Sequence, residues 1–318
     1  MTCTLTARWG VMALGTHHFG ADVTPRQAAA LLDAFTAAGG RLIDTAPTYG
    51  EQDGAFHAER VIGSYLAATG APLAVATKAG LDPTGQPCLR PETLYDQAHV
   101  SRDRLRRDHL DLFLLHRDDR TIPVSEVADV LHLLLDEGTV HAAGVSNWTP
   151  PRILALNHAL ATRGPHRLTV TSPLWSLARR TRYATDPELV EADAHHLELA
   201  RRQRLVVMPF RTSALGFFTD AFTVGGLRHA DYVRAAYATK GNLERRRRAQ
   251  HLAAELGVTA HHIALAYLRA FDLPVIPVIG ATCPQQIHAA ARACVLHLTV
   301  EQRYYLTSAA EYPYASRG

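Results

Sequence analysis

Short apolar runs alternate with longer amphipathic segments along this chain of 318 residues. Several of the short runs are nearly continuous in apolar residues, which is typical of parallel strands covered on both faces. On this pattern we expect eight strands, at residues 11–14, 41–44, 73–78, 111–116, 140–145, 168–171, 205–209 and 275–279.

The segments between the expected strands carry helix signals. In Val124–Asp136, apolar residues recur at helical spacing, and Gly138 follows the end of the pattern. Thr24-Pro25 and Thr149-Pro150 each place a capping threonine before a proline that suits the first helical position. Repeated strand–helix alternation predicts a parallel sheet, and eight repeats favour a closed (β/α)8 barrel over an open sheet.

Domain organisation follows from the continuity of this alternation. No linker or low-complexity stretch divides the chain, and its length is ordinary for one barrel with insertions. Residues 217–241 interrupt the pattern, so we expect a long loop with a short helix there. The sequence therefore predicts one (β/α)8 TIM-barrel domain over residues 1–318.

Composition narrows the class of protein further. Hydrophobic residues make up 47% and charged residues 20%, the profile of a packed globular protein, while a net charge of +3 is too small to indicate a nucleic-acid or membrane partner. No secretion signal or stretch of 18 apolar residues is evident, and the four cysteines are scattered. We expect a cytoplasmic protein with reduced thiols. The sequence carries no signal for an oligomeric state.

Ionisable residues follow three successive expected strands. In barrels of this kind the active site lies where the strands end. Asp44 and Tyr49 follow the second strand, Lys78 ends the third and His116 ends the fourth. Singly, Asp44 suits a helix cap, Lys78 a surface charge and His116 the core. Together they favour catalysis, because an ammonium lowers the pKa of a nearby phenol and Asp44 would keep Lys78 charged, which predicts a proton donor tuned toward neutral pH.

Seven short motifs occur in order along the chain. They are residues 41–50 (RLIDTAPTYG), 76–78 (ATK), 111–116 (DLFLLH), 144–148 (GVSNW), 216–218 (GFF), 242–246 (NLERR) and 280–286 (GATCPQQ). Together these motifs resemble the aldo-keto reductase superfamily. The set spans almost the whole chain, and it is most similar to the bacterial, potassium-channel-β-like and aryl-alcohol-dehydrogenase-like branch. The resemblance implies reduction of an aldehyde or ketone by hydride transfer from a nicotinamide.

The resemblance also implies a catalytic tetrad of Asp44, Tyr49, Lys78 and His116. Tyr49 would donate the proton to the carbonyl oxygen. Lys78 and Asp44 would tune that proton donor. His116 would orient the carbonyl by hydrogen bonding.

Cofactor contacts follow from the same resemblance. Ser146 and Asn147 match positions that hold the nicotinamide carboxamide, and Ser172 stands where glutamine is common. Phe210 matches the aromatic residue that stacks on the nicotinamide. Arg211 begins Arg-Thr-Ser where Ser-Pro-Leu usually wraps the pyrophosphate. A Rossmann site is not expected, because no Gly-x-Gly-x-x-Gly occurs at a strand–helix turn.

The end of the chain bears on the choice of cofactor. Gly280, Thr282 and Gln286 match the start of the family's final helix, which binds the adenosine 2′-phosphate. We therefore expect NADPH, with NADH possible. Ala289 and Ala290 replace a glutamate and an asparagine that often contact the adenine, which predicts weaker binding than in relatives that carry those side chains.

The substrate itself is not identified by the sequence. His17, Phe19, Trp148 and Trp175 follow expected strands and are candidates for contact with a small carbonyl substrate. Core packing explains the two tryptophans equally well.

Two other functions are alternatives to carbonyl reduction. A regulatory subunit that holds NADP(H) with slow or no turnover would share these motifs, as potassium-channel β subunits do, although no N-terminal extension points to a channel partner. A metal-dependent barrel hydrolase would need His-x-His or a carboxylate-rich rim, and neither occurs. The adjacent histidines at 17–18, 195–196 and 261–262 lack ligand spacing, so no metal is expected. For the arginines at 245–248, a solvated helix face is favoured over a phosphate clamp.

Overall fold

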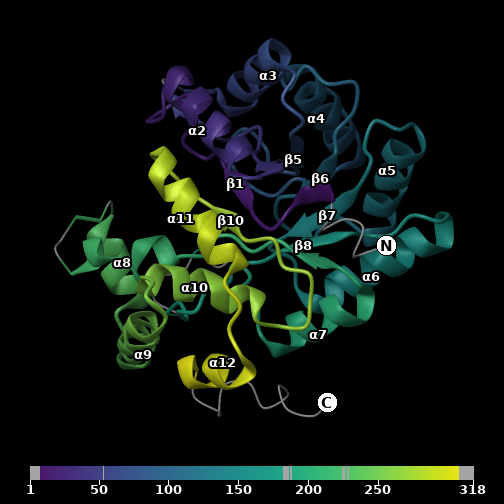
Figure 1. Ribbon diagram of the computed structural model, residues 1–318. Helices are drawn as coiled ribbons and strands as arrows, with labels where there is room; N and C mark the ends of the chain where they lie inside the picture. Colours follow the sequence, from purple (N-terminus) through teal and green to yellow (C-terminus); the bar gives the residue numbers. More distant parts are fainter. Residues whose placement is uncertain are drawn as a thin grey trace.

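The computed structural model describes residues 8–52, 54–181, 186, 188–223, 226–227 and 229–307. Eight parallel strands form one sheet in the order β10-β1-β2-β5-β6-β7-β8-β9, and helices surround it (Figure 1). All eight expected strands are confirmed, each overlapping its predicted range. They are β1 (Ala13–Gly15), β2 (Leu42–Asp44), β5 (Ala74–Ala79), β6 (Leu112–Leu115), β7 (Ala143–Ser146), β8 (Val170–Ser172), β9 (Val206–Val207) and β10 (Val278–Ile279).

Pairing at the two edges closes the sheet into a barrel. Strand β10 pairs in parallel with β1, with Ala13 opposite Val278. On the other edge, Val207 forms a parallel bridge with Val275, and the Ile276 amide donates to the Val207 carbonyl at 2.9 Å. Together with the surrounding helices, this closure confirms the predicted (β/α)8 fold.

The helices alternate with these strands. They are α2 (Pro25–Ala37), α3 (Ala58–Thr69), α4 (Pro91–Arg104), α5 (Val124–Asp136), α6 (Pro150–Arg163), α7 (Ala194–Gln203), α8 (Ala230–Tyr237), α9 (Lys240–Leu256), α10 (Ala260–Arg269), α11 (Pro284–Val295) and α12 (Val300–Leu306). A two-stranded hairpin, β3 (Glu51–Gln52) and β4 (Ala55–Phe56), follows β2. Among the described residues, no helix has the length and apolar character needed to cross a membrane.

The two expected helix starts differ in how they are capped. At α2, Thr24 and Gln27 form a reciprocal capping box, as its sequence suggests. At α6, Thr149 occupies the N-cap position but its side chain makes no capping hydrogen bond, so that part of the prediction is wrong. Pro151 offers a reason, because it stands second in the helix and has no N–H to donate.

Two apolar layers fill the structure. A large layer lies between the strands and the helices, and it includes Phe113, Val145 and Leu131. A smaller layer fills the barrel interior, as alternation along each strand requires. Its members are Trp9, Ala13, Leu42, Ala76, Leu112, Leu114, Ala142, Val170, Val206, Met208, Ile276 and Val278.

The arginine run at 245–248 corrects a sequence prediction. Arg247 and Arg248 pair with Glu244 near the surface of α9, as expected. Arg245 and Arg246 are instead buried, which contradicts the expected solvated face. The cause is the segment that crosses α9, because the Arg246 guanidinium donates to the carbonyl oxygens of Phe217 and Thr219 at 3.0 and 3.2 Å.

The predicted irregular region at 217–241 is confirmed in outline. It contains a short 3-10 helix (Asp220–Phe222) and α8, and residues 224, 225 and 228 lie outside the described part of the chain.

Candidate active site

Strand alternation explains why the predicted site residues meet at one rim. Five of them stand two positions after a residue whose side chain fills the barrel interior, so their own side chains are directed inward at the next level. The pairs are Leu42 and Asp44, Ala76 and Lys78, Leu114 and His116, Val170 and Ser172, and Met208 and Phe210. Gly280, which has no side chain, stands in the same position after Val278. The rim is the carboxyl end of the strands, where barrel active sites form.

A buried ion pair lies at the centre of this rim. The Lys78 ammonium contacts the Asp44 carboxylate, with 2.7 Å between Nζ and Oδ1, and it also donates to the Thr45 carbonyl oxygen at 2.9 Å. Both side chains are less than one-tenth exposed. Burial lowers the pKa of Lys78, but Asp44 and Tyr49 more than offset this and leave that pKa raised. Lys78 is therefore a fixed positive charge.

The Tyr49 ring lies above this charge. The Lys78 Nζ atom is 4.8 Å from the centroid of the ring. The Tyr49 backbone is held by its neighbours, because its amide donates to the Ala46 carbonyl and its own carbonyl accepts from Ala58 at the start of α3. Gly50 next to it has φ +71°, and a β-carbon there would lie 1.9 Å from the Phe19 carbonyl oxygen. Only glycine lets the loops after β1 and β2 approach so closely.

Electrostatics at Tyr49 differ from the sequence prediction. Burial raises the pKa of the Tyr49 hydroxyl, and the Lys78 ammonium offsets only part of this rise. The expected tuning toward neutral pH is therefore wrong for the protein described here, because desolvation of the phenolate outweighs attraction to Lys78. The consequence is a tyrosine that carries its proton at neutral pH, as a general acid must.

His116 completes the group on the side of β6. Its ring centroid lies 5.9 Å from that of Tyr49, and the two rings meet edge to face. Burial lowers the pKa of His116 well below its usual value, and the charges of Lys78 and Arg117 lower it further. The imidazole is therefore neutral, with one N–H to donate.

Ser146, Asn147 and Ser172 are brought together at the ends of β7 and β8. The Ser146 hydroxyl donates to the Ser172 carbonyl at 3.0 Å, and the Asn147 amide donates to the Ser146 hydroxyl and the His116 carbonyl at 3.2 Å each. Asn147 also adopts a left-handed conformation, φ 59°. Its Oδ1 accepts from the Val190 amide at 3.3 Å. A carboxamide oxygen that binds Asn147 Nδ2 must therefore replace one of its two acceptors, whereas Oδ1 can accept a further hydrogen bond from a carboxamide N–H.

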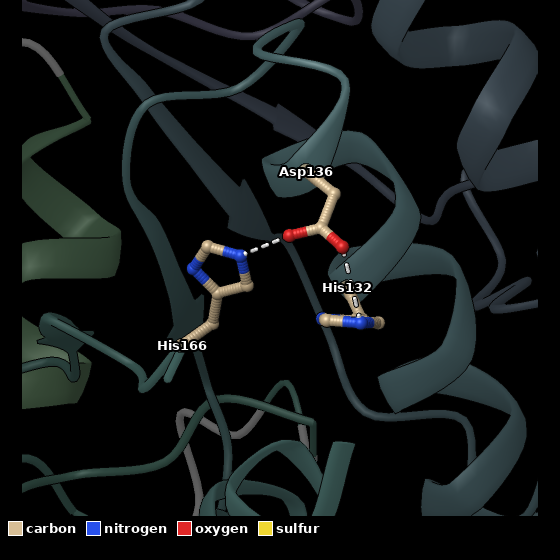
Figure 2. Close-up of side chains that lie close together, drawn as sticks. All are labelled: His132, Asp136 and His166. Atoms are coloured by element: carbon tan, nitrogen blue, oxygen red, sulfur yellow. Dashed lines mark hydrogen bonds and ion pairs between the residues drawn. The ribbon is translucent and has the colours of Figure 1, made fainter. Parts of the chain in front are cut away.

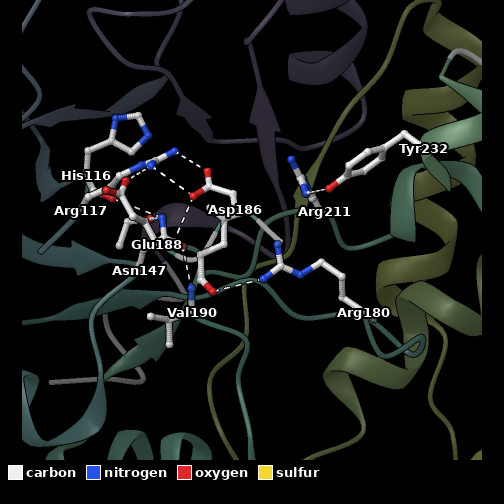
Figure 3. Close-up of polar contacts among 11 residues, drawn as sticks. His116, Arg117, Asn147, Arg180, Asp186, Glu188, Val190, Arg211 and Tyr232 are labelled. Atoms are coloured by element: carbon white, nitrogen blue, oxygen red, sulfur yellow. Dashed lines mark hydrogen bonds and ion pairs between the residues drawn. The ribbon is translucent and has the colours of Figure 1, made fainter. Parts of the chain in front are cut away.

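An ionic cluster that was not expected from the sequence lies beside His116. Arg117 pairs with Asp186, with 2.8 Å between Nη2 and Oδ2, and with Glu188. Figure 3 shows this cluster close to His116 and Asn147. The two ion pairs connect Arg117 to Asp186 and Glu188, which precede Val190 in the chain. Arg117 follows the DLFLLH motif directly, but its acidic partners lie about seventy positions away, so spacing along the chain gave no signal.

Phe210 and Arg211 follow β9 at the same rim. The Phe210 side chain is partly exposed, whereas most residues of the preceding strand are buried. Arg211 has φ 52° and donates from Nη1 to the Tyr232 hydroxyl of α8 at 3.0 Å (Figure 3). A partly exposed aromatic ring and a guanidinium thus follow one another in the chain at this rim.

The predicted phosphate site lies at the start of α11. Gly280 is exposed, and a β-carbon there would meet nothing within 4 Å. The Thr282 amide donates to Gln286 Oε1 at 2.7 Å, so the glutamine side chain occupies a backbone N–H at the predicted phosphate site. A phosphate can take this N–H once Gln286 turns away.

The candidate substrate contacts fall into two groups. His17 meets the Tyr49 ring edge to face, with 4.8 Å between the ring centroids. Phe19, Trp148 and Trp175 are at most 1% exposed in the outer apolar layer, and the Trp175 ring packs on Phe271 at 5.1 Å. Burial favours core packing over substrate contact for these three residues.

Comparison with known proteins supports this architecture. The model of the aldo/keto reductase family matches residues 10–311. A glycerol dehydrogenase from Gluconobacter oxydans is 25% identical, with a TM-score of 0.74 over 96% of this chain and 93% of its own. An aldo/keto reductase from Klebsiella pneumoniae, solved with NADP and acetate, is 22% identical, with a TM-score of 0.67 over the same shares.

Curated relatives are similar over most of the chain. A 6-dehydroglucose reductase from Novosphingobium aromaticivorans is 29% identical over 95% of this chain and 90% of its own. A norsolorinic acid reductase from Emericella nidulans is 28% identical over 92% and 76%. An aryl-alcohol dehydrogenase [NADP(+)] from Phanerodontia chrysosporium is 26% identical over 93% and 80%.

Proposed function

Because the chain belongs to the aldo/keto reductase family, we propose that it reduces an aldehyde or ketone to an alcohol with NADPH, with Tyr49 as the proton donor. One observation carries the proposal. A protonated tyrosine, a fixed ammonium and a neutral imidazole converge at the carboxyl end of the barrel, from β2, β5 and β6.

Each side chain then has a defined task. Tyr49 gives its hydroxyl proton to the carbonyl oxygen as the carbon accepts a hydride. Lys78 stabilises the phenolate that remains, and Asp44 holds Lys78 in place and charged. Neutral His116 donates an N–H to the carbonyl oxygen and so orients it. His17, which contacts the Tyr49 ring, would border the substrate on the other side.

The residues present also fit a dinucleotide. Phe210, Ser146, Asn147 and Ser172 would hold the nicotinamide end, because a partly exposed ring and amide and hydroxyl groups lie together there. The bound nicotinamide supplies the hydride. Arg211, Gly280, Thr282 and Gln286 would hold the phosphates and the adenosine. The Klebsiella pneumoniae relative was solved with NADP.

A panel of carbonyl compounds tests the proposal directly. The named substrates of the relatives differ, so the panel should span sugar ketones, aromatic aldehydes and aryl ketones. We expect oxidation of NADPH, followed by its absorbance, with at least one class. NADPH that binds tightly but is not oxidised by any compound would favour the regulatory-subunit alternative.

The choice of cofactor gives the first prediction. We expect NADPH to bind roughly tenfold more tightly than NADH, because one hydrogen bond from the Thr282 hydroxyl to a charged phosphate contributes about 1.5 kcal/mol. The preference is modest because Gln286 must leave Thr282 before the phosphate can bind there. Ala289 and Ala290 offer the adenine no hydrogen bond, which weakens both cofactors alike. Titration by quenching of tryptophan fluorescence measures both affinities. Thr282→Ala should weaken NADPH and spare NADH, whereas tighter binding of NADH would contradict the assigned phosphate site.

The pH dependence of reduction gives the second prediction. The pKa of Tyr49 is raised and that of His116 is lowered. Neither group therefore changes its charge within about one pH unit of neutrality. We therefore expect kcat/KM for a neutral carbonyl to stay nearly constant over this range. A steep loss of rate toward pH 6 would show that His116 becomes protonated there.

A further inference from the structure

Three side chains with metal-binding atoms converge on the outer surface of the barrel. His132 and Asp136 stand one helical turn apart near the end of α5, and His166 comes from the loop between α6 and β8 (Figure 2). The distance from His132 Nε2 to Asp136 Oδ2 is 3.2 Å, and that from His166 Nε2 to Asp136 Oδ1 is 2.7 Å. All three ligand atoms lie within 4.8 Å of one another.

From this geometry we propose that His132, Asp136 and His166 bind one Zn²⁺ ion. Two imidazoles and a carboxylate are ligands that zinc prefers, and water would fill the fourth position. Ligand atoms of a tetrahedral zinc ion lie about 3.4 Å apart. The three atoms can reach this spacing by small rotations, because the Asp136 side chain is 56% exposed and can turn.

The surroundings hold the two imidazoles in place. The His132 ring packs on Gly164, where an added β-carbon would lie 2.9 Å from Cε1, so a larger residue would displace the ring. The loop that presents His166 is tied by Arg167, whose Nη1 donates to the carbonyls of Gly164 and His166. The ligands thus lie on α5 and on a loop that is held by the hydrogen bonds of Arg167.

Two features of the surroundings limit the affinity of this site for zinc. His132 Nδ1 is buried and makes no hydrogen bond among the residues that the structure describes. Histidine ligands usually donate their second N–H, and loss of such a partner typically weakens binding by about 10–100-fold. The Arg167 guanidinium, which contacts the His166 carbonyl, adds positive charge nearby. We therefore expect micromolar rather than nanomolar affinity.

The position in the fold points to a structural role. The end of α5 and the α6–β8 loop lie at the end of the barrel where strands begin, opposite the rim with Tyr49. Residues at that end serve stability rather than catalysis. A bound ion would link α5 to the segment entering β8. This site differs from the expectation of no metal, which rested on the adjacent histidines and on the absence of His-x-His and of a carboxylate-rich rim. The signal in the sequence is the i, i+4 spacing of His132 and Asp136.

Zinc titration of the full-length, tag-free protein tests the proposal. We expect one Zn²⁺ per chain by competition with a chromophoric chelator, and a higher midpoint of thermal unfolding with zinc present. His166→Ala and His132→Gln should each weaken binding at least tenfold and remove the thermal shift. Circular dichroism checks that both variants fold.

A matched control lies on another helix. His251 and Glu255 of α9 have the same spacing, with 3.5 Å between Nδ1 and Oε1, but within the described ranges no third ligand joins them. His251→Ala should bind zinc as the wild type does. Absence of binding in the wild type, or equal binding in all variants, would overturn the proposal. Neither result bears on carbonyl reduction, since these residues lie away from the rim.

Discussion

Tyr49→Phe is expected to lower kcat for carbonyl reduction by about 10²–10⁴-fold, the usual contribution of a positioned general acid. The ring is kept, so its contacts with His17 and the Lys78 ammonium survive, and only the transferable proton is lost. At about 1.4 kcal/mol for each tenfold, the barrier rises by roughly 3–5.5 kcal/mol. The measurement is steady-state oxidation of NADPH with the best carbonyl from the panel.

Cofactor affinity is the control for this variant. Tyr49 is not among the residues assigned to hold NADPH, so the dissociation constant from fluorescence quenching should be nearly that of the wild type. A variant that kept a tenth of wild-type turnover would exclude Tyr49 as the acid. Equal losses of turnover and of NADPH binding would instead indicate a disturbed loop.

The positions of Asp44, Lys78 and His116 could be predicted because they depend on strand periodicity. Once the apolar runs are placed, alternation directs Asp44, Lys78 and His116 into the barrel one level above Leu42, Ala76 and Leu114. Such positions follow from local sequence patterns. The capping box at Thr24 was predictable for the same reason.

Features that depend on contacts between distant segments could not be predicted. Burial of Arg246 results from a loop folding across α9, and the partners of Arg117 come from beyond β8. The pKa of Tyr49 was misjudged for a related reason. The sequence names the charge beside the phenol but not the degree of burial, and burial has the larger effect.

Lys78→Met is expected to lower both the activity and the stability of the protein. Activity should fall by roughly 10–100-fold or more, because the phenolate left on Tyr49 loses its counter-charge and the pKa of Tyr49 rises further. Stability should fall as well. Removal of one partner from a buried ion pair costs about 3–5 kcal/mol, since the Asp44 carboxylate is left without compensation.

The loss of stability should depend on pH in a defined direction. Burial raises the pKa of Asp44, and the Lys78 ammonium is the main influence that lowers it. Without Lys78, the pKa of Asp44 in the folded state lies further above the unfolded value of about 3.9. A carboxyl group with a raised pKa stabilises the fold when it is protonated and loses this contribution as pH rises. The deficit in unfolding free energy relative to the wild type should therefore be larger at pH 7 than at pH 5.

A double variant separates the two roles of Lys78. Lys78→Met combined with Asp44→Asn removes both charges, so it leaves no buried carboxylate without a partner, and much of the lost stability should return. Activity should stay low, because the ammonium beside Tyr49 is still missing. Urea unfolding at the two pH values and NADPH oxidation measure these effects. A double variant no more stable than Lys78→Met, or a deficit that is the same at both pH values, would show that the Asp44 carboxylate is not the source of the instability.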